Sequence, residues 1–253
     1  MRVKPRSPFG RAVRRLVLIE LRRVKKLAAS AIGGEVEPIH DLRASLRRIR
    51  VLLDTDGGDR SKRLRRRAGQ FSKALGKVRD MDVCLELISE SPEHEALHKA
   101  LESSRQLELM NLREEMKSSR YRRWTKRMVA WSRKDGTAEV VEVKLPEALR
   151  GASANALSQF AGDSEEDLHL LRIGVKNCRY LIELFADALP AGAIGLAADL
   201  RAAQDAFGAE RDRQRLSEYA ASRGVAFPLE PIDVPLLQAT AREALTALES
   251  FVG

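Results

Sequence analysis

The sequence predicts an all-helical fold. Glycine and proline are sparse, with 16 and 9 residues in a chain of 253, and long stretches contain neither. Aromatic residues make up 5% of the chain, whereas hydrophobic residues make up 44%. Apolar residues recur every three or four positions through most of the chain, which is the period of an amphipathic helix. Together these observations favour packed helices over a β-sandwich or a β-barrel.

The apolar periodicity predicts the helices in order, and segments rich in glycine, proline or aspartate predict where most of them end. We expect helices at residues 9–31, 37–54, 59–79, 80–89, 92–134, 147–161, 164–188, 193–222 and 234–251. The breaks between them read AIGGEVEP, TDGGD, SESPE, RKDGTAEVVEVKLPE, AGDSEED, LPAGA and GVAFPLEPIDVP.

Residues 135–146 are the best candidate linker. This stretch contains an Asp-Gly turn, the short β-like segment EVVEV and a proline. We therefore expect a first helical repeat at 1–134 and a second at 147–253.

The net charge of +9 and the sequence pI near 9.8 suggest a polyanionic partner, such as nucleic acid, a membrane surface or polyphosphate. Residues 1–150 hold 36 Lys and Arg against 21 Asp and Glu, whereas residues 151–253 hold 9 against 15. An anion-binding surface is therefore expected mainly in the first 150 residues, unless the few cations of the second part are concentrated in one place.

The cysteines and the N-terminus indicate the cytoplasm. Cys84 and Cys178 have no metal-binding or redox spacing and predict no disulfide framework. The N-terminus is basic, but its apolar run LVLIEL is short and contains Glu20, so we expect neither a signal peptide nor a membrane span.

The segment IHDLRASLRRIRVLLD at 39–54 places a basic stripe beside an apolar one. His40, Arg43, Arg47 and Arg50 fall within an arc of about 80° on a helix. The apolar stripe is centred about 100° away and consists of Ile39, Leu42, Leu46, Ile49 and Leu53. The basic stripe therefore borders the buried face. Its like-charged neighbours repel each other, and a bound anion would offset that repulsion.

The same pattern occurs a second time. HDLRASLRRIRVLLD at 40–54 aligns without gaps with HLLRIGVKNCRYLIE at 169–183, and LGKVRD at 75–80 aligns with FGAERD at 207–212. The first alignment pairs His40, Arg43, Arg47 and Arg50 with His169, Arg172, Lys176 and Arg179. Arg172, Lys176 and Arg179 are the only Lys or Arg between residues 151 and 200. Two matching blocks at nearly the same offset indicate a duplicated helical unit.

A helix with H-x-x-R-x-x-x-[RK]-x-x-R, followed by [LF]-G-x-x-R-D and present twice, resembles the CHAD family, the conserved histidine α-helical domain. The resemblance covers nearly the whole chain. It implies two four-helix bundles related by an approximate two-fold, with inorganic polyphosphate bound in a basic groove between them and no catalysis. It also implies association with polyphosphate granules or polyphosphate enzymes, and no cofactor.

The candidate polyphosphate ligands are cations that can contact phosphate oxygens, because guanidinium groups match phosphate bidentately and a histidine can act as a pH-tuned donor. They are His40, Arg43, Arg47, Arg50, His169, Arg172, Lys176 and Arg179, with Arg66, Lys73 and Lys77 on the companion helix. The second repeat has Asp205 and Ala209 at the positions of Lys73 and Lys77, which predicts an uneven site.

Three features have structural interpretations. We expect Arg79-Asp80 to cap a helix or hold an arginine. Tyr121, Trp124 and Trp131 are interleaved with arginines at 118–134, and core packing is favoured over base stacking. The cations Arg11, Arg15, Arg22 and Lys26 share one face of the first helix, which is either a groove wall or a solvated surface.

Two alternative functions compete with polyphosphate binding. A nucleic-acid-binding protein would also need a basic surface, but no helix-turn-helix, RRM or zinc-finger pattern is evident. The segment HEALH at 94–98 matches the zinc-protease pattern H-E-x-x-H, with Glu95 as the general base. The helix around it is polar and no strand precedes it, so a zinc hydrolase ranks last.

Overall fold

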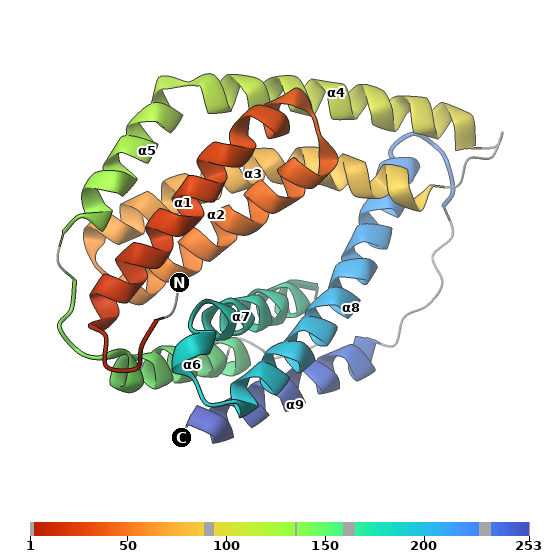
Figure 1. Cartoon of the computed structure of the whole chain (residues 1–253). Coiled ribbons are helices and arrows are strands. Elements are labelled where there is room, and N and C mark those ends of the chain that lie inside the picture. Colours follow the sequence, from red (N-terminus) through yellow and green to blue (C-terminus); the bar gives the residue numbers. More distant parts are fainter. Residues whose placement is uncertain (1–2, 89–93, 135, 159–164, 228–233, 253) are drawn as a thin grey trace. The chain divides into compact units, whose positions relative to one another are not determined.

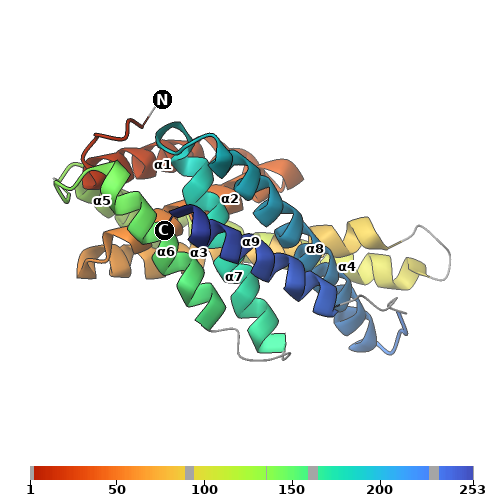
Figure 2. The same cartoon turned by 90° about the horizontal axis from the view of Figure 1, so that it is seen from below.

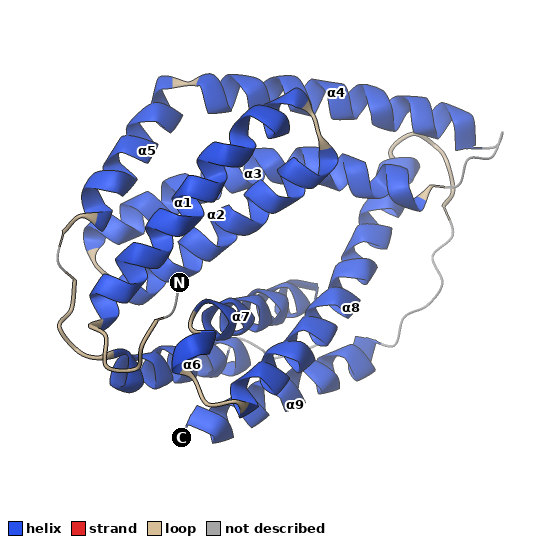
Figure 3. Cartoon of the chain, viewed as in Figure 1, coloured by secondary structure: helices blue, strands red, loops and turns tan. Residues whose placement is uncertain are grey.

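The computed structural model describes residues 3–88, 94–134, 136–158, 165–227 and 234–252. Within these ranges the chain is helical, and its one β-type pairing is an isolated bridge between Pro8 and Val140 (Figure 3). The predicted all-α fold is confirmed. No helix among the described residues is both long enough and apolar enough to cross a membrane.

The helices are long, and most of them are joined by short connections along the chain (Figure 1). Their bounds are α1 Phe9–Gly33, α2 Val36–Asp56, α3 Asp59–Leu87, α4 Glu95–Lys117, α5 Ser119–Ser132, α6 Val141–Ser158, α7 Glu165–Leu184, α8 Gly192–Ala221 and α9 Val234–Val252, with a 3₁₀ turn at Ala186–Ala188.

Two compact units make up the chain, and their boundaries differ from the predicted 1–134 and 147–253. The α2–α5 unit consists of residues 17–134 and 210–230. The α6–α9 unit consists of residues 1–16, 135–209 and 231–253. The difference arises because α1 and α8 each contribute residues to both units, and periodicity alone does not show where a continuous helix changes its packing partners.

In the α2–α5 unit, α2 packs against α3, α3 packs against α4, and α5 contacts both α3 and α4 (Figure 1). The apolar stripe of α2 is the core face, as predicted. Its five members are at most 1% exposed: Ile39, Leu42, Leu46, Ile49 and Leu53. Their burial removes apolar surface from water and thereby holds α2 in one orientation about its own axis.

The C-terminal end of α8 belongs to the α2–α5 unit because it shares a core with α3 and α4. Leu216 and Ala220 are fully buried in a cluster with Cys84 and Leu101. The hydroxyl of Tyr219 donates to the carbonyl of Ala100 at 2.8 Å. Burial, with a smaller contribution from Asp80, raises the pKa of the Cys84 thiol to about 11, so this cysteine is a packing residue.

Two arginines of α4 bind the C-terminal end of α1. Arg105 donates to the carbonyl of Gly34 at 2.8 Å and also pairs with the buried carboxylate of Asp82 on α3. Arg113 donates to the carbonyl of Ile32 at 2.6 Å. The last turn of α1 has no basic residue of its own, so these cations satisfy carbonyl groups that the helix leaves unpaired.

In the α6–α9 unit, α6 packs against both α7 and α9 (Figure 2). The contact between α6 and α7 is close at Gly174, where an added Cβ would overlap the Cβ of Ala156. The N-terminal segment joins this unit through backbone hydrogen bonds from Phe9 to Glu139 at 2.7 Å and from Val141 to Ser7 at 2.9 Å. The ring of Phe9 also stacks on Phe185 with centroids 5.6 Å apart.

Three predicted boundaries were wrong. The helices expected at 59–79 and 80–89 form the single helix α3, since no glycine or proline interrupts that junction. The helix expected at 92–134 is divided at Ser118, whose hydroxyl accepts a hydrogen bond from the Tyr121 backbone at 3.1 Å and caps α5. The expected linker 135–146 is helical from Val141 onward. The predicted break at 89–93 lies outside the described residues, as do residues 161–164 of the break AGDSEED and residues 228–233 of the break GVAFPLEPIDVP.

Two glycines of the α6–α9 unit should respond oppositely to alanine. Gly174→Ala should lower the free energy of unfolding by about 1–3 kcal/mol, because the new methyl group overpacks the contact between α6 and α7. Gly208→Ala should raise it by about 0.5–1 kcal/mol, because Gly208 lies inside α8 with open space at its Cβ position. Urea denaturation followed by circular dichroism measures both values, and equal effects would contradict the close contact at Gly174.

Candidate anion-binding surface

The guanidinium groups of α2 lie over two glycines of α3. The position that a Cβ would occupy on Gly76 is 3.6 Å from Nε and Nη2 of Arg43. The corresponding position on Gly69 is 3.7 Å from Nε of Arg50. The two arginines are seven residues apart, and so are the two glycines. The missing side chains leave room for both guanidinium groups against the α3 backbone.

Arg47 lies between the two arginines along α2, and Lys73 lies between the two glycines along α3. We call Arg43, Arg47, Arg50 and Lys73 the α2/α3 seam. The three arginines are half-buried and Lys73 is exposed. The seam exists because the basic stripe borders the apolar stripe, so burying the apolar residues brings the cations to the line where the two helices meet.

The α2/α3 seam concentrates positive charge, and at Arg50 that charge is only partly compensated. Burial lowers the pKa of Arg50, repulsion from Arg65 and Arg47 lowers it further, and only Asp54 acts in the opposite direction. Nε of Arg50 is buried and has no hydrogen-bond acceptor among the described residues. A cation under these conditions is stabilised by an anion that accepts its hydrogen bonds.

The other predicted ligands of this unit differ in their surroundings. His40 is exposed, and its Nδ1 is 3.7 Å from Asp41. Arg66 is also exposed. Lys77 is exposed but already paired, since its ammonium group is 3.0 Å from Glu108 on α4. Lys77 is therefore less available to an external anion than Lys73.

On α7, the repeated stripe is divided between two environments. His169 is exposed, and Arg172 and Lys176 are half-buried. Arg179, in contrast, is only 6% exposed. Its guanidinium group donates to Glu183 and, at 3.1 Å, to Gln204 on α8. The expectation that Arg179 is a phosphate ligand does not fit this placement, because its charge is already paired inside the fold; the sequence could not show that Glu183 and Gln204 converge on it.

The helix α8, which follows the second occurrence of the motif, also lacks most of the cations that α3 carries after the first occurrence. Arg201 occupies the position of Gly69 and pairs with Glu183 at 2.6 Å. Asp205 occupies the position of Lys73 and Ala209 that of Lys77. Accordingly, the α2–α5 unit holds 32 Lys and Arg against 21 Asp and Glu, whereas the α6–α9 unit holds 13 against 15.

The predicted structural residues lie where core packing requires them. Asp80 lies inside α3 and holds Arg215 of α8, so the expectation that it holds an arginine is confirmed and the capping alternative is wrong. Trp124 and Trp131 are each 2% exposed. Burial raises the pKa of Tyr121 to about 12. Core packing of these aromatic residues is therefore confirmed.

The sequence-based prediction missed Arg65 and a set of six arginines. Arg65 lies near Arg50 and pairs with Asp54 at 3.1 Å. The set of six lines a hollow between α3 and α5, and consists of Arg60, Arg63, Arg67, Arg120, Arg123 and Arg127. The available signal was a shared spacing, since residues 60–67 and 120–127 both read R-x-x-R, an apolar residue, x-x-R.

The HEALH segment lies at the start of α4. His94 is the N-cap residue, and its ring centroid is 5.8 Å from that of Phe227. His98 lies 3.9 Å from Glu102, and Glu95 pairs with Lys99. In the part of the chain that the structure describes, no three His, Cys, Asp or Glu side chains are grouped so that they could hold a metal ion.

Comparison with known proteins identifies the family. The model of the CHAD domain matches residues 15–221. The crystal structure of the CHAD domain from the plant Ricinus communis has a TM-score of 0.74 at 20% identity, covering 99% of this chain and 89% of that chain. PptA from Streptomyces chartreusis has a TM-score of 0.67 at 18% identity, covering 97% and 98%. No curated protein matches the chain. The His/Arg motif that occurs twice in the sequence, the all-helical architecture and the family match agree: this chain belongs to the CHAD domain family.

Proposed function

We propose that this protein binds inorganic polyphosphate without processing it. The observation that carries the proposal is the α2/α3 seam, in which Arg43 and Arg50 lie over glycines with Arg47 and Lys73 beside them. His40 and Arg66 extend this surface. The half-buried Arg172 and Lys176, with His169, form the contribution of α7.

The chemistry of the α2/α3 seam suits a phosphate polymer. Guanidinium groups donate bidentately to phosphate oxygens, and each hydrogen bond to a charged group contributes about 1.5–3 kcal/mol. Phosphates repeat closely along polyphosphate, so a helix face with a cation at each turn can contact several of them. Burial lowers the pKa of Arg50 most, and repulsion from Arg65 and Arg47, which such an anion would relieve, lowers it further.

Membership of the CHAD family supports the same ligand, because the family resemblance implies polyphosphate binding. A duplicated architecture is part of the proposal. It is supported by matched ion pairs, since Arg79 pairs with Glu86 and the aligned Arg211 pairs with Glu218, both seven residues apart. A cytoplasmic role at polyphosphate granules or polyphosphate enzymes follows from the family alone.

Nucleic acid is the competing polyanion. Single-stranded nucleic acids are bound by stacking their bases on aromatic side chains. Trp124 and Trp131 are buried, and the α2/α3 seam itself consists of cations that lie beside two glycines. These features favour a polymer of phosphates without bases.

Long-chain polyphosphate should therefore outcompete RNA and duplex DNA at equal phosphate concentration and fixed salt. The affinity should also fall steeply as salt is added, because neutralising several phosphates releases their counterions. A fluorescence competition assay at several salt concentrations measures both effects. Equal or tighter binding of RNA would reject polyphosphate as the preferred ligand, and a flat salt dependence would reject a polyanion site.

Substitutions in the basic stripe of α2 and in the basic stripe of α7 should each weaken polyphosphate binding. Arg43→Ala with Arg47→Ala, and separately Arg172→Ala with Lys176→Ala, should cost a few kcal/mol of binding free energy, with about 1.5–3 kcal/mol per lost contact as an upper guide. Titration calorimetry measures the loss, and circular dichroism checks folding.

The control variant is Arg122→Ala with Lys126→Ala, which removes the same charge at the same spacing from exposed positions on α5. Its affinity should stay within about twofold of the original. Normal binding by the Arg172/Lys176 variant would restrict the site to the α2–α5 unit.

The zinc-hydrolase alternative makes a different prediction. His94→Ala with His98→Ala should leave polyphosphate affinity unchanged, because neither histidine lies on the α2/α3 seam or on α7. Elemental analysis of the purified protein should find no stoichiometric zinc. One tightly bound zinc per chain that disappears in this double variant would favour metal-dependent chemistry instead.

A further inference from the structure

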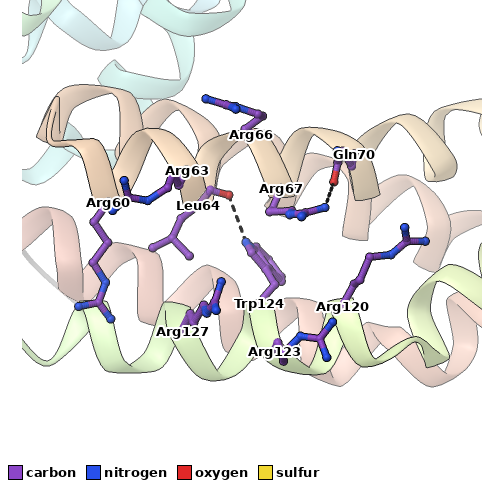
Figure 4. Close-up of a pocket in the computed structure, with 10 residues that line it drawn as sticks. All are labelled: Arg60, Arg63, Leu64, Arg66, Arg67, Gln70, Arg120, Arg123, Trp124 and Arg127. Carbon is purple, nitrogen blue, oxygen red and sulfur yellow. Dashed lines mark hydrogen bonds between the residues drawn. The ribbon is translucent and has the colours of Figure 1, made fainter.

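A hollow of about 720 Å³ lies between the first half of α3 and residues 120–127 of α5 (Figure 4). Seven arginines surround it, together with one glutamine and two apolar residues. The lining residues are Arg60, Arg63, Leu64, Arg66, Arg67, Gln70, Arg120, Arg123, Trp124 and Arg127.

The same residue spacing on two helices builds the walls. On α3 and on α5, three arginines separated by three and four residues share one helix face. Figure 4 shows Arg60 and Arg127 toward one end of the hollow, with Arg67 and Arg120 toward the other. Arg66 points to the opposite side of α3, away from α5.

The apolar residue within each pattern closes the floor. Trp124 is 2% exposed, and its indole nitrogen donates to the carbonyl of Leu64 at 3.2 Å. The ring of Phe71 packs against that of Trp124 with centroids 5.2 Å apart. The floor is therefore a packed part of the core, and it joins the two helices that carry the rows of arginines.

The charge on these walls is mostly unopposed. Arg120 pairs with Glu115 at 2.7 Å, and Arg67 donates to the neutral Gln70 at 2.7 Å. Arg60, Arg63, Arg123 and Arg127 form no ion pair with any described residue. Like charges three or four residues apart destabilise a helix, and a multivalent anion would remove that cost on both helices at once.

The lining selects the ligand by charge and by size. It contains no carboxylate, so it does not suit a cation. Trp124 is covered, so a base has no exposed ring on which to stack. The volume is that of a small-molecule site, and guanidinium groups match phosphate oxygens. We propose that the α3/α5 hollow binds a compact molecule carrying several phosphate groups, independently of the α2/α3 seam.

Inorganic tripolyphosphate is the probe, titrated calorimetrically into the full chain. One equivalent of tripolyphosphate should bind in the hollow. Arg123→Gln with Arg127→Gln should lower the affinity for this equivalent by at least about tenfold, because two charged contacts are lost. The matched control, Arg122→Gln with Lys126→Gln, removes equal charge from the same helix outside the hollow and should change it by less than about twofold. Arg60→Gln, on the opposite wall, should also weaken binding.

Equal losses in the hollow and control variants would indicate diffuse attraction and overturn the proposal. A loss of duplex DNA binding in the hollow variant, with tripolyphosphate binding unchanged, would overturn it in favour of nucleic acid. The hollow is separate from the site of the proposed function. Arg43→Ala with Arg47→Ala should weaken the binding of long-chain polyphosphate, whereas one equivalent of tripolyphosphate should still bind in the hollow. Circular dichroism confirms that each variant is folded.

Discussion

The packing of α2 against α3 determines where the α2–α5 unit displays its positive charge. The basic and apolar stripes of α2 lie about 100° apart, so burying Leu42, Leu46 and Ile49 brings the cations to the junction of the two helices. Gly69 and Gly76 leave space there for two guanidinium groups. The result is a row of half-buried arginines held by the same packing that stabilises the core.

Arginine has two distinct roles in this protein, and neighbouring residues decide between them. Arg105 and Arg113 satisfy carbonyl groups at the end of α1, and Arg179 is paired with a carboxylate inside the α6–α9 unit. These cations hold helices together. Arg50 instead lies among other cations with incomplete compensation. Burial lowers its pKa most, and repulsion from Arg65 and Arg47 lowers it further. Cations of the second kind are the ones suited to an external anion.

The two occurrences of the His/Arg helix differ in how their charges are paired. In the second copy, Arg201 replaces the glycine over which a guanidinium would lie, and Asp205 replaces a lysine. Glu183 then pairs with both Arg179 and Arg201. The second copy therefore uses much of its charge internally, whereas the first leaves its charge at the surface. Binding that depends on both copies would be uneven.

The all-helical fold, the buried stripe of α2 and the basic residues beside it could be predicted from helical periodicity, because periodicity places residues on faces without reference to any other segment. The internal pairing of Arg179 and the α3/α5 hollow could not be predicted in this way, because both depend on side chains from different helices. The sharing of α1 and α8 between the two units likewise depends on how the helices pack. A local pattern predicts the face on which a charge lies, whereas the partner that neutralises it is chosen by packing.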